Sequence, residues 1–109
     1  MTIFGYRPTS VVAVRGAGRV TGILRYPDYD VTCNYVEGTG LYAAAAYGTQ
    51  GIRLHTVHIS GCYGLEAANF ARMLRTGKAD QPLEELLMPV RVLNAIEQSY
   101  LTGKEQAIV

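Results

Sequence analysis

The side chains best suited to binding a metal ion lie in one short stretch that contains His55, His58 and Cys62. On a strand, His55 and His58 face opposite sides of the sheet and cannot share an ion; on a helix they could. Residues 51–54, Gly-Ile-Arg-Leu, favour a strand, and Cys62 could complete a soft site only if the chain turned sharply at Gly61. No further ligands stand at a defined spacing, so a structural or surface role is favoured and no metal residue is predicted. One histidine on an uncovered sheet face could still act as an acid, a base or a hydrogen-bond donor to a ligand.

A glycine-rich stretch, residues 16–22, has the sequence Gly-Ala-Gly-Arg-Val-Thr-Gly and follows an apolar run. It imitates the loop that holds a nucleotide phosphate. That loop works because a helix begins inside it and points backbone N–H groups at the phosphate. The residues after Gly22 are a short β-prone run that ends at Pro27. The stretch therefore predicts a β-turn, and no cofactor-binding residue.

Serine chemistry is not indicated, because no serine stands in a Ser/His/Asp arrangement or in a G-x-S-x-G motif. No catalytic residue is predicted. The eight tyrosines are more informative. Tyrosine is common on half-buried sheets and in the centres of interfaces, because its ring packs while its hydroxyl stays hydrated. The alternatives are sheet packing and a dimer face, and the candidate interface or ligand face is Tyr35, Tyr42, Tyr47, His55 and His58.

Composition narrows the classes of function. The chain has 109 residues with a net charge of +1, and no cluster of Lys and Arg marks a nucleic-acid or anionic membrane partner. No apolar run has membrane-spanning length, and the first residues lack the pattern of a signal peptide. Cys33 and Cys62 form no redox motif. We expect a cytoplasmic protein whose two thiols are small buried hydrophobic groups.

The elements that must position these side chains are strands in the first half of the chain. Short apolar runs punctuated by Gly and Pro predict strands at residues 11–14, 23–26, 29–36, 41–47 and 52–59. Residues 29–36 alternate, with Val31, Cys33 and Tyr35 on one side and Asp30, Thr32 and Asn34 on the other. Hairpin turns are expected at residues 37–40 and 48–51.

The second half is predicted to be helical. Ala67, Phe70, Ala71 and Leu74 recur at helical spacing, and Gly77 ends this helix. Pro82 begins the next element, with acidic residues in its first turn. Because an interior proline loses a hydrogen bond, we expect a short helical turn up to about Met88 and a main helix from about Pro89 to Leu101. Its apolar stripe is predicted to be Val92, Leu93, Ile96 and Tyr100. Residues 107–109 are expected to return as an edge strand.

Strands joined by short turns pair antiparallel. The predicted fold is therefore a single α+β domain over residues 1–109, a two-layer sandwich with a mainly antiparallel sheet and two C-terminal helices on one face. The opposite sheet face must either be polar or meet a second copy of the chain.

Three segments, in this order, resemble the distal part of the C-terminal domain of the Gfo/Idh/MocA family of NAD(P)-dependent oxidoreductases. They are residues 8–14; residues 35–38 with 47–51; and a closing region with Phe70, Leu74, Gly77, Pro82, Leu93, Ala95, Ile96, Ser99 and the Gly103-Lys104 stop. The resemblance implies a family whose enzymes carry a Rossmann domain with G-x-G-x-x-G and an E-K-P motif whose lysine is catalytic. No E-K-P occurs in this chain. The resemblance therefore implies a family scaffold to which no catalytic residue carries over, and NAD(P) only if a partner supplies the Rossmann domain.

The predicted function is self-association, as a homodimer, through the uncovered sheet face, or docking onto a partner that supplies a cofactor domain. Two rival hypotheses stay open. The chain is a fragment of a sugar or polyol dehydrogenase, or it is a small-ligand binding module that uses the tyrosine-rich face with His55 or His58.

Overall fold

The computed structural model describes residues 4–40 and 42–109. The chain divides into two compact units, each described here by itself. The sheet unit comprises the residues up to Glu37 together with Gln81–Val109, and the ribbon unit is Gly38–Asp80. The class is α+β with antiparallel pairing throughout, as predicted.

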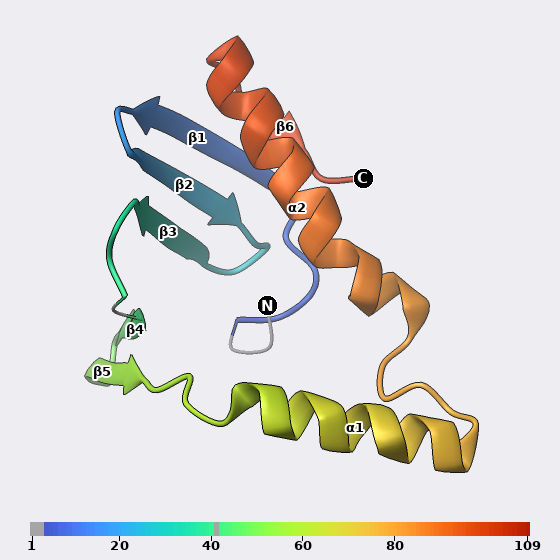
Figure 1. Cartoon of the computed structure of the whole chain (residues 1–109). Helices are drawn as coiled ribbons and strands as arrows, with labels where there is room; N and C mark the ends of the chain where they lie inside the picture. Colours follow the sequence, from blue (N-terminus) through green and yellow to red (C-terminus); the bar gives the residue numbers. More distant parts are fainter. Residues whose placement is uncertain (1–3, 41) are drawn as a thin grey trace. The chain divides into compact units, whose positions relative to one another are not determined.

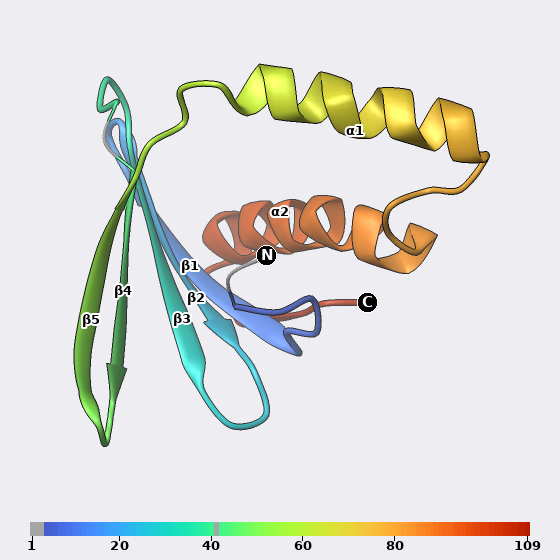
Figure 2. The ribbon, with the colours of Figure 1, turned by 90° about the horizontal axis from the view of Figure 1, so that it is seen from below.

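The sheet unit is built on four strands in the order β3-β2-β1-β6. They are β1 (Ser10–Gly16), β2 (Arg19–Arg25), β3 (Asp30–Val36) and β6 (Gln106–Ala107). The expected return of the C-terminal residues to the sheet is confirmed by β6, which lies antiparallel to β1, and by the Ile108 N–H, which donates to the Thr9 carbonyl at 3.0 Å. Figure 2 shows the sheet edge-on with helix α2 (Leu83–Thr102) against one face.

The β1–β2 hairpin turns at residues 17–18, because Gly16 pairs with Arg19 and Gly18 supplies a positive φ of 65°. The β-turn prediction for the glycine-rich stretch is confirmed. The predicted start of the second strand at Ile23 was wrong, because Gly22 lies inside β2 and pairs with Ala13 and Cys33 on either side. A Cβ on Gly22 would contact Cγ1 of Ile96 at 3.8 Å, so this position lies beneath α2.

The core of the sheet unit lies between one sheet face and α2. Alternate residues of the strands face the helix, and the buried set is Val11, Ala13, Leu24, Tyr26, Val31, Val92 and Ala95. Tyr26 packs in this core, its hydroxyl donates to the Gly5 carbonyl at 2.9 Å, and its ring stacks on Tyr29 with centroids 4.6 Å apart.

Helix α2 corrects two predictions. It begins at Leu83, after Pro82, and continues through Pro89, so the predicted division at Pro89 was wrong. The helix continues although Pro89 removes one backbone hydrogen bond, because packing of its buried face along β1 stabilises it. The predicted apolar stripe was wrong to include Leu93, which is 64% exposed. The residues that α2 buries are Val92, Ala95 and Ser99.

The ribbon unit contains the two-stranded antiparallel ribbon β4 (Tyr42–Gly48) and β5 (Gly51–Val57), and helix α1 (Cys62–Thr76) (Figure 1). The predicted start of β4 at Leu41 lies outside the described residues. The turn at 48–51 is confirmed by the pairing of Gly48 with Gly51. The predicted burial of the first helical stripe was wrong, because Phe70 and Leu74 are 60% and 71% exposed. None of the described residues of β4, β5 and α1 is buried.

Candidate interaction surface

The five residues predicted to share one face lie in different places. Tyr35 belongs to β3 in the sheet unit. Its side chain points to the same side of the sheet as the buried Val31, because the two residues are four positions apart on the strand. It therefore stands on the face that α2 covers, beyond the reach of the helix, and is 76% exposed. The placement of Tyr35 on the uncovered face was wrong because that prediction assumed one continuous sheet through all five strands.

The ribbon separates the other four predicted residues. Residues directly opposite one another in an antiparallel pair project to the same side, and the register pairs Ala44 with His55 and Tyr47 with Ile52. Tyr42 and His55 therefore share one side of the ribbon, while Tyr47 projects from the other side. His58 follows the end of β5 and is exposed. The prediction of a single tyrosine- and histidine-lined face was wrong.

The side of the ribbon that carries Tyr47 is apolar and exposed. We call it the apolar ribbon face; its residues are Ala43, Ala45, Tyr47, Ile52, Leu54 and Thr56. Tyr47, Ile52 and Leu54 are 75%, 64% and 79% exposed. The opposite side carries Arg53 and His55. The alternation of Ile52, Leu54 and Thr56 with Arg53 and His55 was the sequence signal for this face.

The β4 strand is a bare sheet edge. Its residues 42–47 read Tyr-Ala-Ala-Ala-Ala-Tyr, with no charged side chain and no proline. Within the ribbon unit it pairs only with β5, so its other edge presents backbone N–H and C=O groups without a strand partner in that unit. Edge strands of soluble proteins usually carry lysine, proline or a bulge that blocks pairing with another chain. The β4 edge has no charge or proline of this kind.

Helix α1 adds an exposed apolar stripe of its own. Tyr63, Phe70 and Leu74 fall on one side of the helix and are 83%, 60% and 71% exposed. An apolar stripe on a helix is normally buried against a sheet or another helix. This stripe therefore marks a second surface that no other element of the ribbon unit covers.

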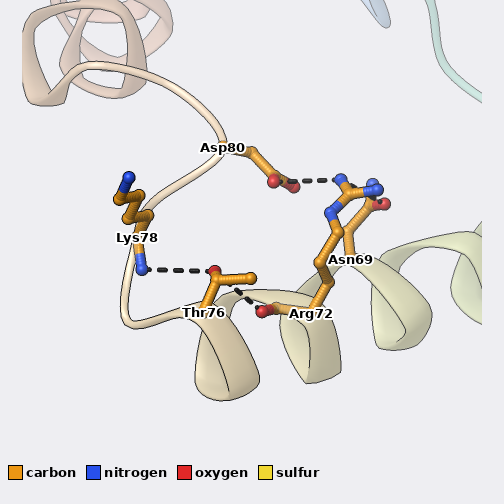
Figure 3. Close-up of polar contacts among 5 residues, drawn as sticks. All are labelled: Asn69, Arg72, Thr76, Lys78 and Asp80. Carbon is orange, nitrogen blue, oxygen red and sulfur yellow. Dashed lines mark hydrogen bonds and ion pairs between the residues drawn. The ribbon is translucent and has the colours of Figure 1, made fainter.

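The polar groups at the end of α1 have a structural role (Figure 3). Arg72 bridges Asn69 Oδ1 at 3.1 Å and Asp80 Oδ1 at 2.9 Å, and the Thr76 hydroxyl donates to the Arg72 carbonyl at 2.9 Å. The Lys78 N–H donates to the Thr76 hydroxyl at 3.3 Å. These bonds satisfy groups of the last helical turn and tie the following loop to it, so they leave no convergent site for a ligand.

Helix α2 is apolar on its outer side as well. Leu86, Val90 and Leu93 are 48%, 54% and 64% exposed, on the side opposite to Val92 and Ser99. This outer stripe is interrupted by Glu97 and Asn94, whereas the apolar ribbon face contains no charged residue.

One hollow of about 380 Å³ opens beside the β1–β2 turn, lined by Arg15, Gly16, Gly18, Arg19, Val20, Tyr35 and Glu37. This hollow lies beside the glycine-rich stretch whose sequence imitates a phosphate-binding loop. The Arg15 guanidinium lies 5.0 Å from the centre of the Tyr100 ring, in a cation–π contact. No helix begins at the turn, so the backbone N–H groups that such a loop needs are absent from this hairpin.

The titratable groups form no recognisable catalytic centre. Within residues 4–40 and 42–109, no three His, Cys, Asp or Glu side chains come together to hold a metal ion. Cys33 and Cys62 are both exposed, so their predicted burial was wrong. The reason for Cys33 is that β3 is an outer strand of the sheet unit, where α2 no longer covers the face. Partial desolvation still raises the pKa of the Cys33 thiol above its ordinary value.

Ser99 is a structurally important residue that sequence reasoning missed. It is fully buried on α2; its hydroxyl accepts a hydrogen bond from the Ala13 N–H at 2.8 Å and donates one to the Lys104 carbonyl at 2.7 Å. Strand β6 pairs only with Ser10 and Val11 of β1, so β6 offers no carbonyl to the Ala13 N–H. Its position on the same helical side as Val92 and Ala95 was the signal that could have found it.

Comparison of the chain with models of protein families, with curated proteins and with solved structures found no match. Of the helices in the described residues, neither is long and apolar enough to cross a membrane.

Proposed function

We propose that this chain is a non-catalytic association module that forms a homodimer through its ribbon unit. The observation that carries the proposal is that none of the described residues of β4, β5 and α1 is buried. A two-stranded ribbon is marginally stable at best in water, and three or more strands or a covering helix are needed for independent stability. The ribbon unit therefore needs a surface from outside itself.

The exposed area of the chain supports this proposal. Two separately compact units with the sizes of the sheet unit and the ribbon unit would together expose about 7,150 Å², by the scaling of surface with mass. The chain exposes 8774 Å². The excess of about 1,600 Å² is larger than the roughly 800 Å² that each partner buries in a standard-size interface. The chain therefore has enough uncovered surface for a stable dimer.

We also propose that the chain shares its ancestry with the oxidoreductase family that it resembles. The scaffold is shared, while the isolated chain binds no NAD(P) unless a partner supplies a Rossmann domain. A fluorescence titration of the isolated chain with NADH is expected to show no saturable binding. Tight binding would contradict the non-catalytic assignment.

The dimer is tested by measuring mass by light scattering over a concentration series. We expect a species of twice 11.9 kDa that dissociates on dilution. Tyr47→Gln, on the β4 strand of the apolar ribbon face, removes an aromatic contact worth about 0.2–1 kcal/mol in each copy and should raise the dimer dissociation constant about two- to thirtyfold. Arg53→Gln introduces the same side chain on the opposite ribbon side and is the matched control. A monomer at every concentration, or equal effects of the two substitutions, would refute the proposal.

A further inference from the structure

We infer that the dimer forms by antiparallel pairing of β4 with β4 of a second copy, in a register centred on Ala45. This inference rests on the proposed self-association and specifies its geometry. It starts from which backbone groups of β4 point away from β5. A two-residue hairpin loop is closed by a hydrogen-bonded pair, and such pairs then alternate with non-hydrogen-bonded pairs along the strands.

The alternation can be checked on the β1–β2 hairpin, which has the same loop length. Counting from its closing pair, Gly16 and Arg19, the alternation turns the N–H of Ala13 and of Val11 away from β2. The Ala13 N–H does bond outside the hairpin, to Ser99 Oγ at 2.8 Å, and Val11 is paired with Gln106 of β6. The rule therefore holds in this protein.

Applied to β4, the same count begins at the closing pair, Gly48 and Gly51. It turns the backbone groups of Ala43, Ala45 and Tyr47 toward the bare edge. A twofold axis that relates two antiparallel neighbours stands perpendicular to the sheet, so directly opposed residues must belong to the same side of the ribbon. The register that uses all three outward residues places Ala45 opposite Ala45 of the second copy and Ala43 opposite Tyr47.

The side chains of β4 fit this register. Tyr47 lies opposite Ala43 of the second copy, and Tyr42 lies opposite Gly48, so each large ring faces a small residue. Aromatic side chains across from glycine or alanine are a favourable cross-strand arrangement. No charged residue lies on β4, so no like charges meet at the axis. The product is a four-stranded sheet in the order β5-β4-β4-β5, in which the two apolar ribbon faces become one continuous surface.

A single substitution separates this pairing from the internal pairing of the ribbon. Ala45→Pro removes an N–H that points to the bare edge and leaves the N–H groups that bond to β5, which is the position where an edge strand tolerates proline. We expect this variant to keep the ribbon, seen as unchanged β4–β5 contacts by NMR, and to weaken the dimer at least about a hundredfold. Ala44→Pro removes an inward N–H and should disrupt the ribbon itself.

Disulfide trapping tests the register without destabilising the chain. In a background with Cys33→Ser and Cys62→Ser, Ala45→Cys places a thiol opposite its own copy, at a Cα separation of about 5.5 Å that suits a disulfide. Ala44→Cys, the matched control, lies two residues away from its own copy, at about 8 Å, which is too far. Fast oxidative cross-linking of the first variant and not of the second is expected.

The outcomes distinguish this inference from the proposed function. A dimer that survives Ala45→Pro, cross-links at neither position and dissociates on Leu93→Gln would overturn the β4 register and place the interface on the outer side of α2, while self-association stands. A chain that stays monomeric at every concentration would overturn both. Cross-linking at Ala44 instead of Ala45 would overturn the register.

Discussion

Removing the Ser99 hydroxyl should destabilise the sheet unit strongly, although Ser99→Ala deletes a single atom and leaves a good helix former. The substitution leaves the Ala13 N–H beyond the end of β6 without its 2.8 Å acceptor and the Lys104 carbonyl without its 2.7 Å donor. A buried donor left unsatisfied costs about 1–3 kcal/mol, and the second bond contributes about 0.5–1.5 kcal/mol. We expect a loss of about 2–3 kcal/mol, which lowers the melting temperature of a domain this size by about 8–24 °C.

The measurement is urea unfolding together with amide hydrogen exchange. Ser10→Ala is the matched control, because the Ser10 hydroxyl bonds to the exposed Glu105 carboxylate and its loss should cost less than about 1 kcal/mol. In Ser99→Ala the exchange of the Ala13 N–H should accelerate more than that of the other core amides, since its partner is lost. Equal stabilities for the two variants, with unchanged Ala13 exchange, would refute the role assigned to the Ser99 hydroxyl.

Three further predictions follow from α2, from the core tyrosine and from the thiols. Pro89→Ala should stabilise the chain by about 1–3 kcal/mol in urea unfolding, because it restores a helical N–H. The neighbouring control Val90→Ala should change the stability little. A destabilised Pro89→Ala would show that the packing of α2 is fitted to the proline. Desolvation, and then the neighbouring Tyr29, raise the pKa of Tyr26 above its ordinary value of 10.0, so the folded state holds this proton more tightly than the unfolded state does. The stability from Tyr26 is full below pH 10 and is lost as the pH rises through the folded pKa, a loss that Tyr26→Phe should remove from unfolding curves at pH 9 and 11. Burial raises the pKa of the Cys33 thiol, so alkylation of Cys62→Ser by iodoacetamide should have its midpoint above about pH 8.5, and a midpoint below that value would contradict the placement of Cys33.

Local chemistry determined much of the sheet unit. The alternation of residues 30–35, the Gly18 turn and the return of residues near Ala107 to the sheet were readable because each depends on neighbouring residues. The boundaries that failed, at Gly22 and Pro89, are those at which packing overrides propensity. Gly22 stays in β2 because strands flank it on both sides, and Pro89 stays in α2 because the helix packs on β1.

The candidate surface was predicted less well, for a physical reason. The tyrosines and histidines were assigned to one face on the assumption that all strands share one sheet, yet sheet membership depends on hydrogen bonds between distant residues. Tyr35 lies in the sheet unit, whereas Tyr42 and Tyr47 project from opposite sides of the ribbon. Burial had the same limit. The stripe of Phe70 and Leu74 was correctly placed on a helix, but periodicity shows only that a side is apolar, not that anything covers it.

The sequence by itself determined the α+β class, the hairpin turns at residues 16–19 and 48–51 and the glycine-ended helices, because these follow from backbone preferences over a few residues. The hairpin expected at residues 37–40 did not form, because β3 and β4 belong to separate sheets. Only the tertiary structure decided that Ser99 completes the ladder beside Ala13, that the strands divide into two sheets and that β4 is left as an uncharged edge. These are relations between residues far apart in the chain. They depend on which hydrogen-bonding groups remain unpaired once the strands have found their partners.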